Sequence, residues 1–348
     1  MELLDQDTMK GKQQSYKHPY IIAETAYNHE GDIDYLYEMI DELGDLQVNA
    51  VKFHLLLNLD SYMKKTHPLF SQLKTWLFSK QQWTDIITYA QGKHLDIVAL
   101  CDDVESINFL QQQKNIRAIE IHATSINDYF MLQEAAAFPG RIILGVGGST
   151  PDEITYAIDT LKAQNKQDIL LMYGFQSYPT KYEDINLSKM IEINELFSLS
   201  VGYADHTGFN DPHNEVVSVA AAMMGFEVLE KHYTLTPGKK RIDYEAAVGK
   251  KQLKKIKELM EIALRAHGHT SAAMSTAEQQ YGGVGPMKKA IVAKKSIARG
   301  STLSLDNLWF KRTEEKSKIP QRDFPKLIGR QAKIHIKKDE IIDYRKIG

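Results

Sequence analysis

The sequence predicts an α/β protein in which a (β/α)8 barrel, or TIM barrel, is followed by a small second domain. Eight short apolar runs rich in β-branched residues alternate with longer segments of helical period, and the amino-acid composition changes after about residue 250. At 348 residues, the chain has room for a barrel of about 250 residues and a second domain of roughly 60. These observations together indicate two domains.

The eight apolar runs are the expected strands, because each is short and rich in β-branched residues. In chain order they are IIAETA (21–26), NAVKFHL (49–55), DIVALC (96–101), AIEIHA (118–123), RIILGV (141–146), DILLMY (168–173), SVGYAD (200–205) and VLEKHYT (228–234). Helices are expected between them at 34–46, 81–94, 104–115, 149–165, 185–197 and 215–226. A doubly wound sheet is the alternative, but eight strands joined by right-handed crossovers favour a barrel.

The C-terminal part has a different composition. Residues 250–268 form a basic amphipathic pattern that predicts a helix, and the Gly-rich stretch that follows is typical of a linker. Short strand patterns around a Gly-containing turn come next. We therefore expect a barrel domain over 1–270, a linker over 271–285 and a small β-rich domain over 286–348.

Composition excludes several classes of protein. The 43 basic and 45 acidic residues leave a net charge of −2, which disfavours binding to nucleic acid or to an anionic membrane. The single cysteine, Cys101, cannot form a disulfide or a zinc-thiolate cluster within the chain. There is no apolar run of about 18 residues and no hydrophobic signal region, so we expect a cytoplasmic protein.

The chemistry of a TIM barrel lies at the C-terminal ends of its strands. His206 and His232 end two neighbouring expected strands, and together with Glu24 they could bind one divalent cation. Lys52 interrupts an apolar run, so it either pairs with a carboxylate such as Glu230 or binds an anionic ligand. The other polar candidates at strand ends are Asn28, His54, Glu120, His122, Gln176, Tyr178, Asp205 and Lys231.

The run LGVGGST (144–150) opens an expected helix, where its backbone amides could hold an anion. Its glycines lack a fixed fingerprint spacing, and a tight turn explains them nearly as well.

The chain resembles the N-acetylneuraminate (sialic acid) synthase family from about residue 17 to its end. The resemblance rests on IIAETAYNHEGD (21–32), AVKFH (50–54), DVESINFL (103–110), SYPTKYEDINL (177–187), VGYADHTG (201–208), LEKHYTL (229–235) and RIDYEAAV (241–248). In the second domain, SIARGSTLSLDNLWFKR (296–312) and IGRQAKIHIKKDEII (328–342) resemble the antifreeze-like, or SAF, domain. The resemblance thus implies a TIM barrel followed by an SAF domain.

The resemblance also implies a function. Members of this family are transferases that condense phosphoenolpyruvate with an N-acylated amino sugar, release phosphate and use a divalent metal such as Mn²⁺ or Mg²⁺. Their products are nonulosonic acids for surface glycans. The matching positions imply His206 and His232 as metal ligands, Glu24 beside the metal-bound water, Lys52 as a donor-binding cation, and Tyr178 and Asp243 at the acceptor sugar. Arg312 resembles an arginine offered by a partner subunit, which implies a domain-swapped homodimer.

Several positions depart from the family pattern on the donor side. Glu120 stands where the family has a donor-binding lysine, Leu100 replaces a phosphate-contacting threonine, and Ala204 replaces a serine. Three hypotheses follow: a synthase with a rearranged donor site, a metal-dependent aldolase, lyase or epimerase that needs no phosphoenolpyruvate, and an inactive binding homologue. Under the second, Glu120 and His122 act as acid, base or added ligands, and their pairing raises the pKa of the histidine. Retention of the metal-binding residues argues against the third.

Overall fold

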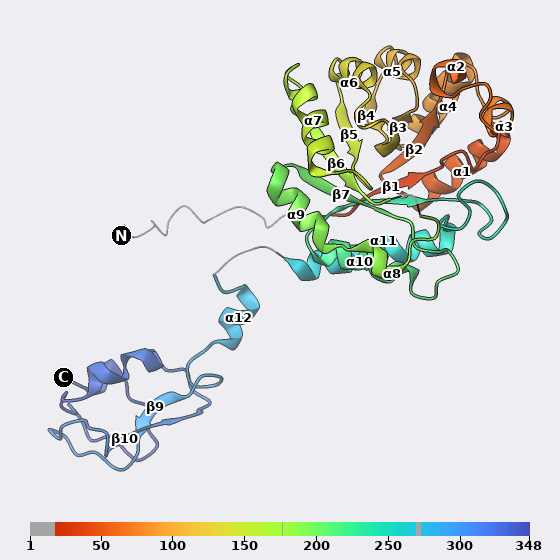
Figure 1. Ribbon diagram of the computed structural model, residues 1–348. Coiled ribbons are helices and arrows are strands. Elements are labelled where there is room, and N and C mark those ends of the chain that lie inside the picture. The colour runs from red at the N-terminus through yellow and green to blue at the C-terminus, as the bar shows by residue number, and fades with distance from the viewer. Residues whose placement is uncertain (1–17, 176, 269–272) are drawn as a thin grey trace. The chain divides into compact units, whose positions relative to one another are not determined.

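The computed structural model describes residues 18–175, 177–268 and 273–348. The chain forms two compact units that divide after Gly268 (Figure 1). Within these described ranges, no helix combines the length and the apolar character needed to cross a membrane.

The first unit is a closed barrel of eight parallel strands, which confirms the predicted fold. Its strands pair in sequence order, and β1 closes the ring by pairing with β8. The strands are β1 (Tyr20–Glu24), β2 (Ala50–Leu55), β3 (Asp96–Cys101), β4 (Ile116–Ile121), β5 (Arg141–Gly145), β6 (Ile169–Tyr173), β7 (Ser200–Asp205) and β8 (Val228–His232). All eight predicted strands are therefore present, each within a few residues of its expected bounds.

Helices surround the barrel on its outer side (Figure 1). They are α1 (Ile33–Leu46), α2 (Leu59–Tyr62), α3 (Phe70–Lys74), α4 (Lys80–Gly92), α5 (Val104–Gln111), α6 (Tyr129–Ala136), α7 (Pro151–Lys162), α8 (Tyr182–Ile185), α9 (Ser188–Phe197), α10 (Asn214–Met223) and α11 (Lys250–His267). Local sequence sets their starts: Ser79 and Gln82 form a capping box at α4, and Thr150 and Glu153 form another at α7. The short helices α2, α3, α6 and α8 were not predicted.

Side chains on each strand alternate between the inside of the barrel and the layer beneath the helices. The larger apolar core fills the layer between strands and helices, with members such as Ile21, Ala23 and Phe53. A smaller cluster fills the lower part of the barrel interior: Ile22, Ala50, Val98, Ala118, Ile143, Leu170, Met172 and Ala204. Charged residues take the next inward positions toward the C-terminal ends of the strands, where the apolar filling stops.

The second unit has its own apolar core and a two-stranded antiparallel sheet of β9 (Ala290–Ala293) and β10 (Leu308–Lys311). Isolated bridges such as those joining Ile297 to Ile336 and Thr302 to Gln331 extend the β character of this unit. The helix α12 (Thr276–Tyr281) lies in the segment predicted as a linker, where Ser275 and Glu278 form a capping box.

Candidate metal centre and cavity

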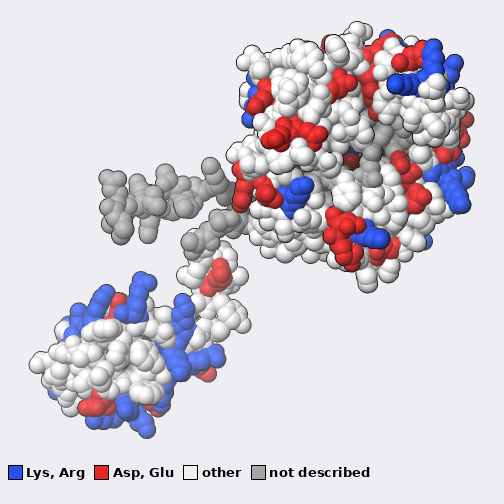
Figure 2. All heavy atoms as spheres, in the orientation of Figure 1, with Lys and Arg blue, Asp and Glu red and all other residues white. Residues whose placement is uncertain are grey.

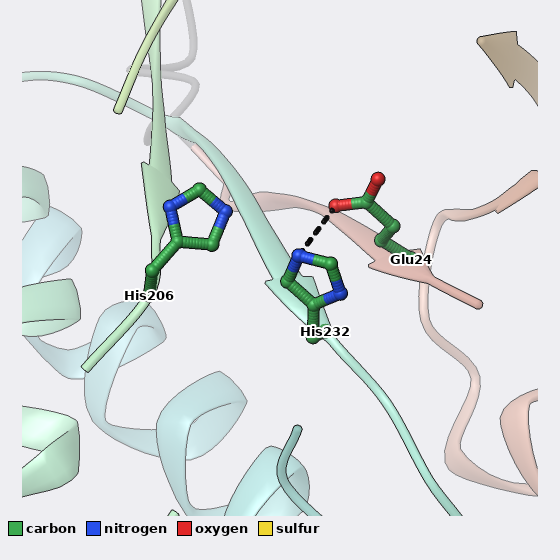
Figure 3. Close-up of side chains that lie close together, drawn as sticks. All are labelled: Glu24, His206 and His232. Atoms are coloured by element: carbon green, nitrogen blue, oxygen red, sulfur yellow. Dashed lines mark ion pairs between the residues drawn. The ribbon is translucent and has the colours of Figure 1, made fainter. Parts of the chain in front are cut away.

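Three side chains meet at the C-terminal ends of β1, β7 and β8. Glu24 is the last residue of β1, His232 is the last of β8, and His206 follows β7 directly. One ligand atom from each lies within 4.8 Å of the others, and the side chains point toward one another (Figure 3). The structure therefore brings together the three residues that the sequence suggested as a metal site.

The ring nitrogens of both histidines are arranged as a cation would require. Nδ1 of His206 lies 3.1 Å from the carbonyl oxygen of Phe175, an arrangement that assigns the proton to Nδ1 and leaves the lone pair on Nε2. Nε2 of His232 is buried and has no hydrogen-bond partner among the described residues, although it lies 3.3 Å from Oε2 of Glu24. A buried nitrogen facing a carboxylate without a hydrogen bond is costly unless a cation lies between the groups. The donor set therefore fits a divalent metal ion.

The protonation of these groups also suits metal binding. Burial lowers the pKa of His206 to about 4 and that of His232 to about 3, so both rings are neutral near pH 7. Burial opposes ionisation of Glu24, but its contacts with His232 and the Lys52 ammonium outweigh this and keep the pKa of its carboxyl well below the usual value. Neutral imidazoles and an ionised carboxylate are the forms that bind a metal.

Lys52 lies beside this triad, at the centre of three buried carboxylates. Its Nζ lies 2.6 Å from Oε2 of Glu120, 2.8 Å from Oε2 of Glu230 and 3.3 Å from Oε1 of Glu24. The four side chains come from β2, β4, β8 and β1, and each is almost completely buried. The ion-pair interpretation of Lys52 therefore describes the structure, and Glu120 is its closest partner.

One ammonium among three carboxylates leaves an excess of negative charge. Burial opposes the charge on Lys52, but Glu120 and Glu230 raise its pKa well above the usual value. Burial raises the pKa of Glu120, and it raises that of Glu230 further, despite their contacts with Lys52. Burial therefore favours the neutral form of Glu230 more strongly than that of Glu120.

His54 extends this network at the edge of the triad. Its Nε2 lies 2.6 Å from Oε1 of Glu24, and its ring packs edge-on against Tyr27. Burial opposes protonation of His54, but the hydrogen bond to Glu24 outweighs it and raises the pKa of the imidazole. His54 is thus a positioning partner for the carboxylate of Glu24.

A cavity of about 340 Å³ opens over the triad and the Lys52 network. It is visible as a hollow in the face of the barrel unit in Figure 2. Seven of the predicted site residues line it: Glu24, Lys52, His54, Glu120, His122, Tyr178 and His206. Tyr178 packs edge-on against the rings of His206 and His232, with ring centroids 5.1 and 5.5 Å away.

The structure places other predicted substrate-binding residues away from the cavity lining. The side chain of Asn28 donates to the carbonyl of Ile242 and accepts from Tyr35 and Thr234, and thereby holds the loop that carries Asp243. Burial raises the pKa of Asp243 to about 6. Gln176 lies outside the described residues.

Arg312 belongs to the second unit. Its guanidinium donates through Nε and Nη2 to the carbonyl oxygen of Pro286, at 2.9 and 2.6 Å.

Asp205 and Lys231 face the layer beneath the helices. Nζ of Lys231 lies 3.1 Å from Oδ2 of Asp205, and neither side chain is exposed. Thr207 and Ser218 complete the network by donating to the Asp205 carboxylate. This buried pair supports the ends of β7 and β8, from which the two histidines project.

His122 lies in the cavity wall, with Nδ1 2.9 Å from the hydroxyl of Thr124. Burial lowers its pKa to about 4. The expectation that pairing with Glu120 raises the pKa of this histidine is therefore wrong: burial dominates, and the strongest contact of Glu120 is with Lys52.

Two residues of the site were missed from the sequence. Phe175 orients His206 through its backbone carbonyl, for which no sequence signal exists. Glu153 lines the cavity and caps α7, accepting from the backbone N and the hydroxyl of Thr150 at 2.7 and 2.9 Å. The capping-box pattern from Thr150 to Glu153 could have revealed it.

The barrel architecture and the polar site at the strand ends agree with a comparison with known families. Residues 46–272 match the NeuB family, and residues 288–347 match the SAF domain. The chain belongs to the NeuB family. The resemblance inferred from the sequence motifs is thereby confirmed.

Relatives and solved structures of this NeuB-family chain agree. It is 27% identical to N,N'-diacetyllegionaminic acid synthase of Campylobacter jejuni over 94% of this chain and 99% of that one. It is also 27% identical to N-acetylneuraminate-9-phosphate synthase of Mus musculus, covering 97% and 96% of the two chains. The crystal structure of N-acetylneuraminic acid synthetase from Leptospira borgpetersenii in complex with citrate matches with a TM-score of 0.69 and 28% identity, over 76% of this chain and 90% of that chain.

Proposed function

We propose that this protein is a sialic acid synthase-like enzyme that joins a three-carbon acid to an N-acylated amino sugar, forming a nonulosonic-type acid. The observation that carries the proposal is the triad of Glu24, His206 and His232, of which Glu24 and His206 line the cavity together with Tyr178. The named relatives are synthases of such acids, which supports the same class of product.

The triad would hold a divalent ion, and such an ion would polarise the aldehyde oxygen of the sugar. Two imidazole ligands favour Mn²⁺ over Mg²⁺, because Mg²⁺ prefers oxygen ligands. His54 holds the carboxylate of Glu24 in place, and the ring of Tyr178 packs edge-on against both histidine rings. Asp243 is part of the proposed acceptor-sugar region.

The identity of the three-carbon donor distinguishes two versions of this function. Phosphoenolpyruvate is the donor that the family resemblance implies, with Lys52 as its binding cation. A second candidate function is a metal-dependent aldolase, lyase or epimerase that does not use phosphoenolpyruvate. The specific observation in its favour is that Lys52 is already surrounded by Glu120, Glu230 and Glu24.

We also propose a cytoplasmic, domain-swapped homodimer in which Arg312 serves the partner's cavity. The charges support it: residues 269–348 contain 17 basic and 8 acidic residues, whereas residues 1–268 contain 26 and 37. Figure 2 shows Lys and Arg gathered on the visible face of the second unit. Sedimentation at increasing salt tests this: we expect a dimer that weakens as salt rises, and a monomer at low salt would refute it.

The test of the proposed reaction uses the Mn²⁺-loaded protein with a panel of N-acylated amino sugars. Each sugar is combined with phosphoenolpyruvate or with pyruvate, and products are measured by mass spectrometry and, after removal of Mn²⁺, phosphorus NMR. We expect a new acid only with donor, sugar and metal together, and none with His206→Ala. Release of phosphate identifies phosphoenolpyruvate as the donor. Absence of a new acid with every pair, while the metal binds, would refute the proposed function.

A further inference from the structure

The cavity offers little to a phosphate group. Lys52 is the one Lys or Arg side chain lining it among the residues that the structure describes, and three buried carboxylates surround its ammonium. A phosphate ester carries about −1.5 to −2 charges at pH 7, in addition to the carboxylate of an enol donor. Binding such a donor would bring several negative charges to a group of side chains that already has more carboxylates than cations.

The helix end at the cavity is also occupied by a carboxylate of the protein. Gly147, Gly148 and Ser149 line the cavity just before α7, where backbone amides could hold an anion. The carboxylate of Glu153 instead accepts from the backbone N of Thr150, at 2.7 Å. Carboxylates of the protein therefore already contact the lysine and the backbone N of Thr150 at the helix end, two groups to which a phosphate could otherwise bind.

Part of the wall beside Glu120 is apolar or small. Met172 and Ala204 line the cavity and offer no hydrogen-bond donor from their side chains, and Gly145 lies beside Glu120. A Cβ at Gly145 would lie 2.9 Å from the backbone N of Ala123 and 3.4 Å from Oε1 of Glu120, so a larger residue would crowd this part of the wall. Glu120 itself is held beside Lys52 by the ion pair at 2.6 Å.

We propose that Glu120 determines donor specificity: by holding the ammonium of Lys52, it excludes phosphorylated donors and leaves a cavity for a small 2-keto acid without phosphate. This inference rests on the proposed function, since it assumes that the cavity binds the donor. A 2-keto acid of this kind carries one negative charge, which the network and a divalent ion tolerate better than a phosphate ester.

The test is binding of phosphoenolpyruvate, inorganic phosphate and pyruvate to the full-length, Mg²⁺-loaded protein. Phosphorus NMR follows the first two, and saturation-transfer proton NMR follows pyruvate. We expect the native protein to bind pyruvate and to bind neither phosphorus compound at millimolar concentration. Glu120→Gln removes the competing charge without adding volume, so it should strengthen phosphoenolpyruvate binding about ten-fold or more. Glu120→Lys should strengthen it further.

Glu195→Lys is the matched control, because it makes the same charge change on the exposed surface of α9 and should leave binding unaltered. Thermal melting shows whether each variant folds. If Glu120→Lys does not fold, the binding measured for Glu120→Gln tests the proposal. Native binding of phosphoenolpyruvate as tight as in Glu120→Gln would overturn the proposal. Failure of the native protein to bind pyruvate would overturn the assignment of the donor class.

Binding of the same panel of N-acylated amino sugars, including N-acetylmannosamine, is measured on the same samples to separate the two proposals. Sugar binding together with tight native binding of phosphoenolpyruvate leaves the proposed function standing and removes this inference. If the native protein binds pyruvate but neither phosphorus compound, and binds no amino sugar, the role of Glu120 is supported and the proposed function is refuted.

Discussion

Replacing Lys52 by Met should destabilise the barrel unit strongly. The change keeps the length of the side chain but removes the cation that lies 2.6, 2.8 and 3.3 Å from Glu120, Glu230 and Glu24. Removing one partner of a buried ion pair costs about 3–5 kcal/mol, because the other partner is left buried without compensation. For a domain of this size, each kcal/mol lowers the melting temperature by about 2–4 °C, so the expected loss is roughly 6–20 °C.

The assay is thermal and urea unfolding followed by circular dichroism. Lys80→Met is the matched control, since Lys80 pairs with Glu105 at 2.7 Å while both side chains stay about half exposed. An exposed pair contributes at most about 1 kcal/mol, so this control should melt close to the native protein.

A second variant checks the cause of the loss. Adding Glu120→Gln to Lys52→Met should recover part of the stability, because it removes one of the uncompensated carboxylates. A loss below about 1 kcal/mol in Lys52→Met alone would refute the reasoning, because the carboxylates would then be neutral or hydrated without the lysine.

Three further outcomes are expected. His206→Ala should weaken Mn²⁺ binding at least about 100-fold in titration calorimetry, because removing a metal ligand lowers the affinity more than removing a residue that hydrogen-bonds to a ligand. Unchanged affinity would exclude His206 as a ligand. Gly147→Ala should lower the melting temperature by more than Gly148→Ala, because its Cβ would lie 1.7 Å from the carbonyl oxygen of Gly174, whereas Gly148 meets only the cost of a φ of +77°. Asp103→Ala should cost more in urea unfolding than the about 1–2 kcal/mol of a lost N-cap at α5, because the carboxylate also accepts from the backbone N of Leu57 and of Asn58; an unchanged midpoint would contradict this.

The barrel could be predicted because buried parallel strands have a strong sequence signal. Each strand is covered on both faces, so it appears as a short continuous apolar run that stands out from the amphipathic helices. The short helices gave no such signal. α6 is eight residues long and begins with Tyr129 and Phe130, which are both exposed, so helical periodicity is obscured at its start.

The alternation of side chains explains why two predicted substrate contacts do not face the cavity. Ala204 and His206 take inward positions at the end of β7, so Asp205 between them faces the helices. For the same reason, Lys231 faces outward between Glu230 and His232. The alternation of side chains along a strand, applied strictly to the sequence, would have shown that Asp205 and Lys231 do not face the cavity.

The contacts of Lys52 could not be predicted from the sequence, because they join side chains from four different strands. Strand parity places Lys52 and Glu120 on the inward side, but it does not say which carboxylate the ammonium contacts. β3 lies between their strands, and their contact crosses the barrel interior past Leu100, which is the register partner of Glu120. The distance of 2.6 Å becomes visible only when the closed barrel fixes the height of each residue.

The composition of this network is also an argument about its purpose. Glu24 and Glu230 already place two carboxyl groups beside the ammonium of Lys52, so a third one at Glu120 is not needed to pair the buried lysine. Burial raises the pKa of Glu120, which means that folding opposes its ionisation. Its charged form therefore makes the folded state less stable, and a buried group of this kind points to a role in binding a ligand. Because Glu120 contacts Lys52, the one Lys or Arg side chain that lines the cavity among the described residues, selection of the donor is the role that this arrangement supports.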